Sequence, residues 1–187
     1  MTLTDRFGRV HRDLRISLTD HCNLRCTYCM PAEGVPWLPR TTLLTPEELM
    51  RIVRIAVGEG IEEVRLTGGE PLLRPDCVDV VAAIASVEPR PEISITTNGI
   101  GLARLAEPLK RAGLARVNVS LDTLKPDRFH QLTRRNRLAD VLTGIAAADA
   151  AGLHPVKLNA LQLRGINDDE APDLLAFAMN HGYELRF

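Results

Sequence analysis

Short β-rich runs alternate with helical stretches along this chain, and that alternation limits the folds open to it. The β-rich runs lie at residues 14–18, 64–67, 93–97, 117–121, 156–163 and 183–187. The helical stretches lie at residues 46–59, 77–87, 102–112, 138–151 and 169–181. Strands that alternate with helices of this length pair in parallel through right-handed crossovers. The pattern therefore predicts an α/β fold of six strands, either an open doubly wound sheet or a β/α barrel.

Local signals support the positions of these helices. Thr45, Pro46 and Glu48 form the pattern of a capping box with proline at the first helical position. Glycines follow three of the predicted helices, as C-terminal caps do, at positions 113, 152 and 182. In both candidate architectures ligands bind at the C-terminal ends of the strands, so polar residues at those ends are candidate site residues.

Composition narrows the class of protein. The chain has 187 residues with 23 Lys and Arg against 24 Asp and Glu, a length suited to one core. The balanced charge provides no overall field for nucleic acid or anionic membrane, so we expect small-molecule ligands. Residues 1–12 are charged, and no apolar run approaches the ~20 residues of a membrane span. We expect a cytoplasmic protein without structural disulfides among its four cysteines.

Three cysteines lie within eight residues after the first strand. Cys22, Cys26 and Cys29 form a CxxxCxxC pattern on a loop, and thiolates favour zinc or iron-sulfur clusters. Three ligands leave one position open, which is what a catalytic metal needs. Cys77 follows the start of a valine-rich helix and is expected in the core. A redox pair at Cys26 and Cys29, or a zinc module without turnover, remains an alternative at this point.

A glycine-rich turn follows the second strand. Gly68 and Gly69 remove the Cβ atoms that would keep a ligand from the backbone, and Glu70 and Pro71 complete a GGEP sequence. Such a turn is common between a strand and a helix, so alone it says little. Together with CxxxCxxC on the preceding βα unit, the GGEP turn is a specific signal of a functional site.

With these motifs the chain resembles the radical S-adenosylmethionine enzymes. Further matches resemble the GTP 3′,8-cyclase family, also called the molybdenum cofactor biosynthesis protein A family. They are RDLR (12–15), DHCN (20–23), CMP (29–31), RLTGGEPL (65–72), TTNG (96–99), NVSLD (118–122) and GIND (165–168). The resemblance runs from about residue 5 to the end of the chain. It implies a partial parallel β/α barrel, similar to a TIM barrel.

The resemblance also implies the site residues. It implies that a 4Fe-4S cluster is held by Cys22, Cys26 and Cys29. It implies that S-adenosylmethionine is bound by Tyr28, Gly68, Gly69, Glu70, Pro71 and Ser120. It implies that GTP is bound by Arg15, Arg65, Thr96 and Lys157. Arginine and lysine are suited to a triphosphate, although single basic residues in strands are usually rim charges.

In that family an electron reduces the cluster, which cleaves S-adenosylmethionine to methionine and a 5′-deoxyadenosyl radical. The radical takes hydrogen from ribose C3′ of GTP, and that carbon attacks guanine C8, which opens molybdopterin synthesis. No single protein acid or base is assigned as catalytic. The resemblance implies an external electron donor and a downstream pterin synthase as partners, and a homodimer is a further expectation.

The chain departs from the family in two respects. Glu63 stands where relatives often have lysine, which would weaken the grip on the triphosphate. The family also continues into a region with three further cysteines that hold a second 4Fe-4S cluster and bind guanine. We therefore expect residues 1–187 to be a truncated core domain, or one that needs a partner to cover the edge strand at 183–187. A basic patch of Arg134, Arg135 and Arg137 would either assist the triphosphate or simply be solvated.

Overall fold

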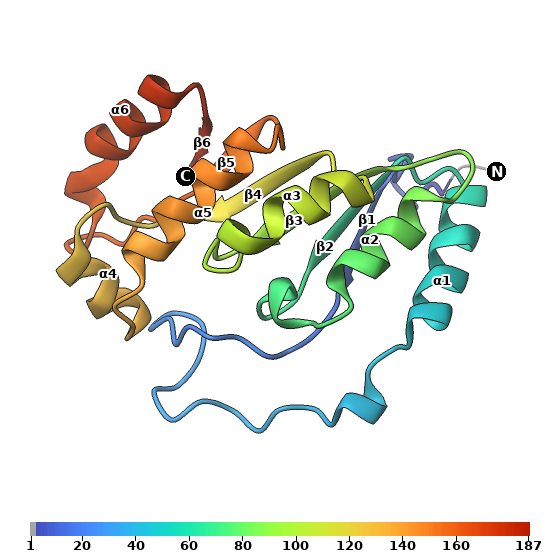
Figure 1. Cartoon of the computed structure of the whole chain (residues 1–187), viewed down its shortest axis with the longest axis horizontal. Helices are drawn as coiled ribbons and strands as arrows, with labels where there is room; N and C mark the ends of the chain where they lie inside the picture. Colours follow the sequence, from blue (N-terminus) through green and yellow to red (C-terminus); the bar gives the residue numbers. More distant parts are fainter. Residues whose placement is uncertain (1–2) are drawn as a thin grey trace.

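Six parallel strands form one curved sheet in the order in which they occur along the chain (Figure 1). The computed structural model describes residues 3–187. The strands are β1 (Asp13–Ser17), β2 (Glu63–Thr67), β3 (Glu92–Thr97), β4 (Arg116–Ser120), β5 (Val156–Asn159) and β6 (Glu184–Arg186). The edges of the sheet are β1 and β6.

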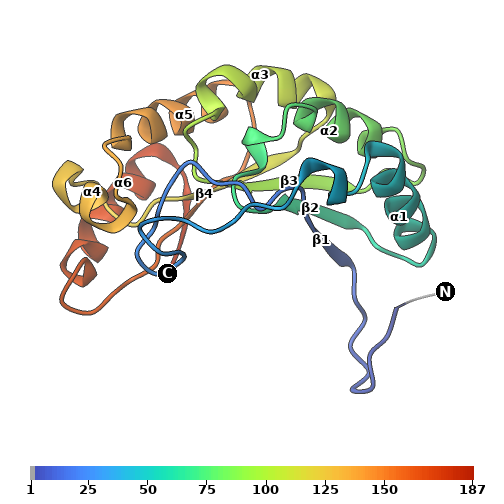
Figure 2. The same ribbon diagram turned by 90° about the horizontal axis from the view of Figure 1, so that it is seen from below.

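The helices lie along the outer, convex side of the sheet (Figure 2). They are α1 (Pro46–Gly58), α2 (Cys77–Ala85), α3 (Leu102–Ala112), α4 (Pro126–Thr133), α5 (Leu138–Ala150) and α6 (Ala171–His181). A doubly wound sheet would carry helices on both faces. The partial β/α barrel expected from the resemblance is therefore confirmed, and the doubly wound alternative is wrong.

The sequence predicted five main helices, and the structure adds a sixth. Helix α4 has eight residues and begins at Pro126. It is too short and too polar to show a clear apolar period, and it is stabilised by Phe129 and Leu132, which are buried. The strand predicted at 156–163 ends at Asn159 instead, and α6 begins at Ala171 after a 3-10 turn.

The predicted helix signals are confirmed where the structure tests them. The Thr45 hydroxyl accepts from the Glu48 amide at 3.2 Å, and the Glu48 carboxylate accepts from the Thr45 amide at 2.8 Å. Gly113 and Gly182 end α3 and α6 in the left-handed conformation. Cys77 lies 1% exposed in the core, as predicted.

Apart from the Thr96–Thr97 end of β3, the strands alternate between apolar and polar residues, which gives the sheet two different faces. Leu66, Ile95, Val119 and Leu158 are fully buried, and they pack in the hydrophobic core that also includes the inner faces of the helices. Residues one position away point to the concave face, where Arg15 pairs in register with Arg65, and Thr96 with Asn118 and then Lys157. Because helices cover only the convex side, the concave face is free to hold a ligand.

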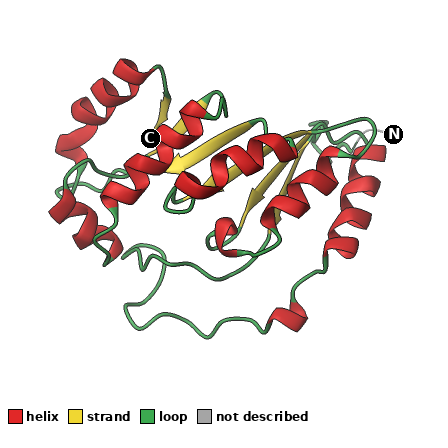
Figure 3. Ribbon diagram, in the orientation of Figure 1, coloured by secondary structure: helices red, strands yellow, loops and turns green. Residues whose placement is uncertain are grey.

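The long stretch between β1 and α1 is almost entirely loop (Figure 3). One short 3-10 turn, Arg40–Thr42, interrupts it. This loop carries all three clustered cysteines and begins at the C-terminal end of β1. No helix among residues 3–187 is long and apolar enough to cross a membrane.

Candidate active site

A cavity of about 220 Å³ lies at the C-terminal ends of the central strands, and we call it the cysteine cavity. Its walls come from the loop after β1, the turn after β2, the ends of β3 and β4, and helix α4. It brings together most of the residues predicted for the cluster and for S-adenosylmethionine. They are Cys22, Cys26, Tyr28, Cys29, Gly68, Gly69 and Ser120.

The three cysteines lie at this cavity with unequal exposure. Cys22 and Cys26 are half-buried and Cys29 is exposed. Burial raises the pKa of Cys22, and raises that of Cys26 to about 11. The carboxylates of Glu70 and Asp122 raise these two pKa values further, and the neighbouring thiols add to the shift. Among residues 3–187, no three His, Cys, Asp or Glu side chains converge closely enough to hold one metal ion. In an iron-sulfur cluster each thiolate binds a different iron, so three soft donors around one cavity suit a cluster without converging on a point.

The glycine pair lies directly against the start of the cysteine loop. A Cβ on Gly69 would lie 2.3 Å from the carbonyl oxygens of Asp20 and His21, and one on Gly68 would lie 2.4 Å from that of Thr19. The Gly69 amide donates to the Thr19 carbonyl at 2.6 Å. Gly68 also has φ of +147°. Only glycine fits this backbone-to-backbone contact, which leaves the polar edge of the turn open to the cavity.

Glu70 and Pro71 are placed differently from the other residues predicted to bind S-adenosylmethionine, because they lie behind the cavity wall. The Glu70 carboxylate is 1% exposed. It accepts from the Thr97 hydroxyl at 2.6 Å and from the Asn98 amide at 2.7 Å. Burial raises the pKa of Glu70, and these hydrogen bonds oppose that shift. The side chain therefore ties the GGEP turn to the end of β3.

Two side-chain hydrogen bonds tie the cysteine loop to the strand ends. The Tyr28 hydroxyl donates to the Asp122 carboxylate at 2.5 Å, and the Asn98 side-chain amide donates to Asn23 at 2.7 Å. Burial raises the pKa of Asp122, and the bonds from Tyr28 and the Leu161 amide oppose that shift. Asp122 and Asn98 belong to the NVSLD and TTNG motifs, but the sequence predicted no role for either residue. Their position just after β4 and β3 is the signal that marks them.

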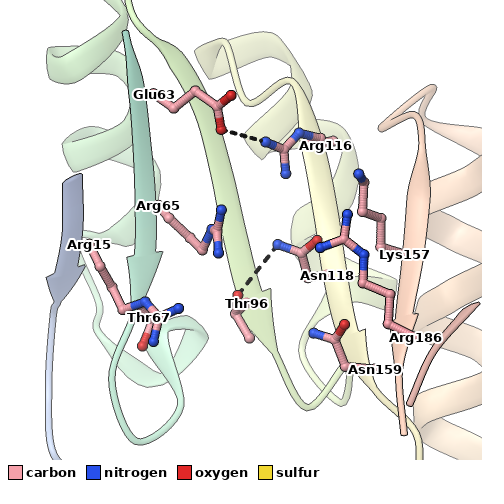
Figure 4. Close-up of a pocket in the computed structure, with 10 residues that line it drawn as sticks. All are labelled: Arg15, Glu63, Arg65, Thr67, Thr96, Arg116, Asn118, Lys157, Asn159 and Arg186. Carbon is pink, nitrogen blue, oxygen red and sulfur yellow. Dashed lines mark hydrogen bonds and ion pairs between the residues drawn. The ribbon is translucent and has the colours of Figure 1, made fainter. Parts of the chain in front are cut away.

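A second cavity, of about 470 Å³, lies on the concave face of the sheet (Figure 4), and we call it the basic cavity. All four residues predicted for GTP line it, and each comes from a different strand. The lining residues are Arg15, Glu63, Arg65, Thr67, Thr96, Arg116, Asn118, Lys157, Asn159 and Arg186. Arg116 and Arg186 were not predicted, because the resemblance did not mark them, although the two-residue period of their strands places them on the same face as Arg15 and Arg65.

Ion pairs hold most of the cations in the basic cavity. Arg65 pairs with Asp13 at 2.7 Å, and Lys157 pairs with Glu184 at 2.8 Å. Arg15 makes no ion pair within the part of the chain that the structure describes. The Arg65 Nε is buried without a hydrogen-bond partner, although buried donors are normally satisfied. An unpaired cation and an orphaned donor in one cavity suit an anionic ligand.

Glu63 lies in the basic cavity, where it forms an ion pair with Arg116. Its carboxylate accepts from Arg116 Nη2 at 2.9 Å (Figure 4). Arg116 Nε also donates to Glu92 at 2.6 Å. The expectation was that Glu63 would reverse a triphosphate contact. The structure pairs this carboxylate with Arg116, and Arg15, which lines the same cavity from the adjacent strand β1, makes no ion pair among the described residues.

The two cavities adjoin one another. Thr67 and Thr96 line both of them. A ligand bound among the basic residues and a cofactor bound at the cysteines would therefore share one wall.

Comparisons with known proteins agree with this geometry. Residues 16–178 match the family model of the radical SAM superfamily. The chain is 64% identical to the GTP 3′,8-cyclase of Streptomyces coelicolor and 60% identical to that of Mycolicibacterium smegmatis. These alignments cover 99% and 98% of this chain, but 54% and 51% of the relatives. The chain thus spans about half the length of the curated relatives it matches.

Solved structures show the same fold at low sequence identity. Streptococcus suis SuiB, in a crystal structure bound to S-adenosylmethionine, matches 92% of this chain and 39% of its own length. The identity is 22% and the TM-score is 0.74. Methylornithine synthase matches 95% of this chain and 52% of its own length at 20% identity, with a TM-score of 0.71. The cysteine pattern, the partial barrel and the family match agree, and the chain belongs to the radical SAM superfamily.

Proposed function

We propose that the chain is the core of a GTP 3′,8-cyclase, which converts GTP to (8S)-3′,8-cyclo-7,8-dihydroguanosine 5′-triphosphate. This is the first step of molybdenum cofactor biosynthesis. The observation that carries the proposal is the shared wall at Thr67 and Thr96 between the cysteine cavity and the basic cavity. The 64% identity to a relative of that name supports it.

Enzymes of this superfamily use a 4Fe-4S cluster and S-adenosylmethionine, and the cysteine cavity has residues that suit both. Cys22, Cys26 and Cys29 would hold the cluster through three of its irons. When bound, the two cofactors supply the radical chemistry that joins C3′ of the ribose to C8 of guanine. The residues that would contact S-adenosylmethionine at this cavity are Tyr28, Gly68, Gly69 and Ser120. Glu70 and Pro71 would act indirectly, by fixing the turn.

The basic cavity would hold the triphosphate of GTP. Arg15 is available without breaking an ion pair, and Arg65 has a free buried donor. Lys157 lies on the same face and is 14% exposed, so its ammonium is partly desolvated. Charge-assisted hydrogen bonds from such groups are stronger than those between neutral groups. Thr96, at the shared wall, would contact the nucleotide where the two cavities meet.

Further parts of the proposal concern what lies outside the chain. Residues 1–187 would form the radical SAM core domain of a longer architecture. The guanine base would bind a second cluster that residues beyond this core supply. An external electron donor, a downstream pterin synthase and a second copy of the chain would be its partners in the cytoplasm.

Anaerobic reconstitution with iron and sulfide, followed by binding and turnover assays, tests the proposal. We expect the protein to take up iron and to bind GTP at least about tenfold more tightly than guanosine, because the triphosphate contacts several cations. Measuring 5′-deoxyadenosine and the cyclic product separately distinguishes full turnover from uncoupled cleavage of S-adenosylmethionine. A protein that holds one zinc without iron, or that has no affinity for GTP, would defeat the proposal.

A further inference from the structure

Arg134 has an unusual backbone conformation at the end of α4. Its φ is 56°, and it is the sole non-glycine residue with positive φ in the described range 3–187. For an arginine this conformation is strained, because Cβ approaches the following carbonyl. Such strain persists only where the surrounding structure fixes it, so the contacts of this side chain become informative.

The Arg134 guanidinium reaches the cysteine loop. Its Nη1 donates to the Arg25 carbonyl at 2.7 Å and lies 3.4 Å from the Met30 carbonyl. Arg25 directly precedes Cys26, and Met30 directly follows Cys29. One side chain therefore contacts the backbone on both sides of the Cys26–Cys29 segment.

The backbone at the end of α4 adds two further bonds to the same segment. The Arg25 amide donates to the Thr133 carbonyl at 3.0 Å, and the Thr27 amide donates to the Leu132 carbonyl at 2.8 Å. Leu132 is 1% exposed, so this end of the helix is anchored in the interior. The helix thus presents two carbonyls and one guanidinium to a loop more than 100 residues away in sequence.

The neighbouring arginines do not share this role, although the sequence groups them in one basic patch. Arg135 donates to the Arg134 carbonyl at 2.8 Å, and Arg137 pairs with Asp140 on α5. Neither Arg134 nor its two neighbours lines the basic cavity. The patch is therefore two surface arginines and one arginine turned towards the cysteine loop.

Helix α4 is itself held firmly at its other end. Glu170 is fully buried and accepts hydrogen bonds from the Thr123 hydroxyl at 2.7 Å and from the Leu124 amide at 3.0 Å. Arg128, on α4, also donates to Glu170. These contacts join α4 to the start of α6, so the support for the cysteine loop is rigid.

We propose that Arg134 is a positioning residue for the iron-sulfur cluster. By binding the carbonyls of Arg25 and Met30, it fixes the two ends of the segment that carries Cys26 and Cys29. The thiols are thereby arranged before the cluster binds, and the cluster is retained more tightly afterwards. This inference rests on the proposed function only in that these cysteines hold a cluster; it does not depend on GTP.

Substitution of Arg134 by glycine gives the sharpest test. Glycine removes the guanidinium but relieves the backbone strain, which offsets part of the lost hydrogen bonding, so the apoprotein should still fold with a thermal midpoint close to that of the wild type. We expect the reconstituted Arg134→Gly variant to lose iron to a chelator about tenfold faster, because it lacks charged hydrogen bonds of this type. Hydrogen exchange at the Thr27 amide of the apoprotein should also be faster. Arg134→Lys keeps the charge but places its donors on a single nitrogen at the end of a flexible chain, so its rate of iron loss should lie between those of the wild type and Arg134→Gly.

The control is Arg135→Gln, which removes a neighbouring charge that does not reach the loop. It should retain the wild-type rate of iron loss. Electron paramagnetic resonance of the reduced cluster supplies a signature that general destabilisation would not change, and we expect Arg134→Gly to broaden the signal. Unchanged iron loss, spectrum and Thr27 exchange in Arg134→Gly would overturn the inference. A wild-type protein that holds its cluster but has no affinity for GTP would defeat the cyclase proposal and leave this one standing.

Discussion

The cysteine cavity and the basic cavity adjoin, but they are built in different ways. The walls of the cysteine cavity are mainly irregular backbone, where Gly69 meets the Asp20 and His21 carbonyls and hydrogen bonds fix the loop. The walls of the basic cavity are side chains on regular strands, such as Arg15 and Arg65, which lie opposite each other in register. Shape defines the first cavity, and charge defines the second.

This difference predicts how each region responds to substitution. An irregular loop takes its geometry from many tertiary contacts, so losing one close backbone contact shifts several ligands together. A strand side chain takes its direction from the sheet, so its loss leaves the neighbouring side chains in place. We therefore expect substitutions in the cysteine cavity to abolish cofactor binding almost completely. Substitutions in the basic cavity should change ligand affinity by graded amounts.

The largest expected effect is loss of the cluster in Cys26→Ser. A hydroxyl is a poor ligand for iron, and two remaining thiols do not hold the cluster. We expect iron and sulfide contents near zero after reconstitution, with the visible absorbance lost. The matched control is Cys77→Ala, which changes a buried cysteine of the core and should lower the thermal midpoint without lowering iron content. Full iron content in Cys26→Ser would contradict the assignment of this ligand.

Gly69→Ala should have the next largest effect. The added methyl would lie 2.3 Å from two backbone carbonyl oxygens, and backbone yields less easily than a flexible side chain. Forcing the turn and the loop apart should cost about 1–3 kcal/mol, comparable with other overpacked sites. We expect S-adenosylmethionine affinity to fall at least about tenfold, measured by equilibrium binding to the reconstituted protein.

Gly58→Ala is the control for this substitution. Gly58 lies in α1 with nothing within 4 Å of its added Cβ, so alanine should stabilise the protein by about 0.5–1 kcal/mol. If both variants bound S-adenosylmethionine like the wild type, the close contact at Gly69 would have no role in the cofactor site.

The regular parts of the fold were the most predictable from the sequence. The number and approximate positions of the strands and the α1 capping box follow from local patterns, and they are observed except that β5 ends at Asn159. The strand alternation places Arg15, Arg65 and Lys157 on one face once the sheet is known, but the resemblance was needed to choose a barrel. The role of these residues came from the family resemblance, because a single basic residue in a strand is usually a rim charge, and the strand period only shows that they can share one face.

The irregular region was less predictable, because its contacts join distant parts of the chain. Nothing near Arg134 in sequence indicates that its guanidinium meets carbonyls at Arg25 and Met30. The role of Glu70 was also hard to predict, because in this case the local sequence does suggest a role. A carboxylate in a ligand-binding motif suggests a ligand contact, but the Thr97 hydroxyl and the Asn98 amide already satisfy it. Tertiary packing, rather than local pattern, decides the role of both residues.

Arg15→Gln should weaken GTP binding moderately, through loss of the positive charge alone. Arg15 has no acidic partner in the described chain, so its substitution leaves no carboxylate without an ion-pair partner. Substitution of Arg65, in contrast, would leave Asp13 without its partner. Loss of one charged contact should weaken GTP binding about tenfold and leave guanosine binding nearly unchanged. Equilibrium binding of both ligands measures this, with the exposed Arg12→Gln as control. Equal losses for the two ligands would show that Arg15 does not contact phosphate.

The smallest expected effect, and an increase, belongs to Glu63→Gln. The Glu63 carboxylate lies in the basic cavity, 42% exposed, where it opposes an anionic ligand. Arg116 would keep its bond to Glu92, so the neutral variant should retain the wall while the cavity becomes more positive. Because a partly exposed charge is well screened, GTP affinity should rise only about two- to fivefold. The control is Glu107→Gln, which removes an exposed charge on α3 and should change nothing.

The increase produced by Glu63→Gln should shrink as salt is added, since the effect is electrostatic and exposed. A fall in GTP affinity would have a different meaning. It would show that the Glu63 carboxylate holds Arg116 in the position that the ligand needs. Glu63 would then contribute to binding by positioning Arg116. The two outcomes separate a cavity whose charges act independently from one in which ion pairs fix the geometry. If GTP affinity fell, the basic cavity would resemble the cysteine cavity, because contacts among its own residues would fix its geometry.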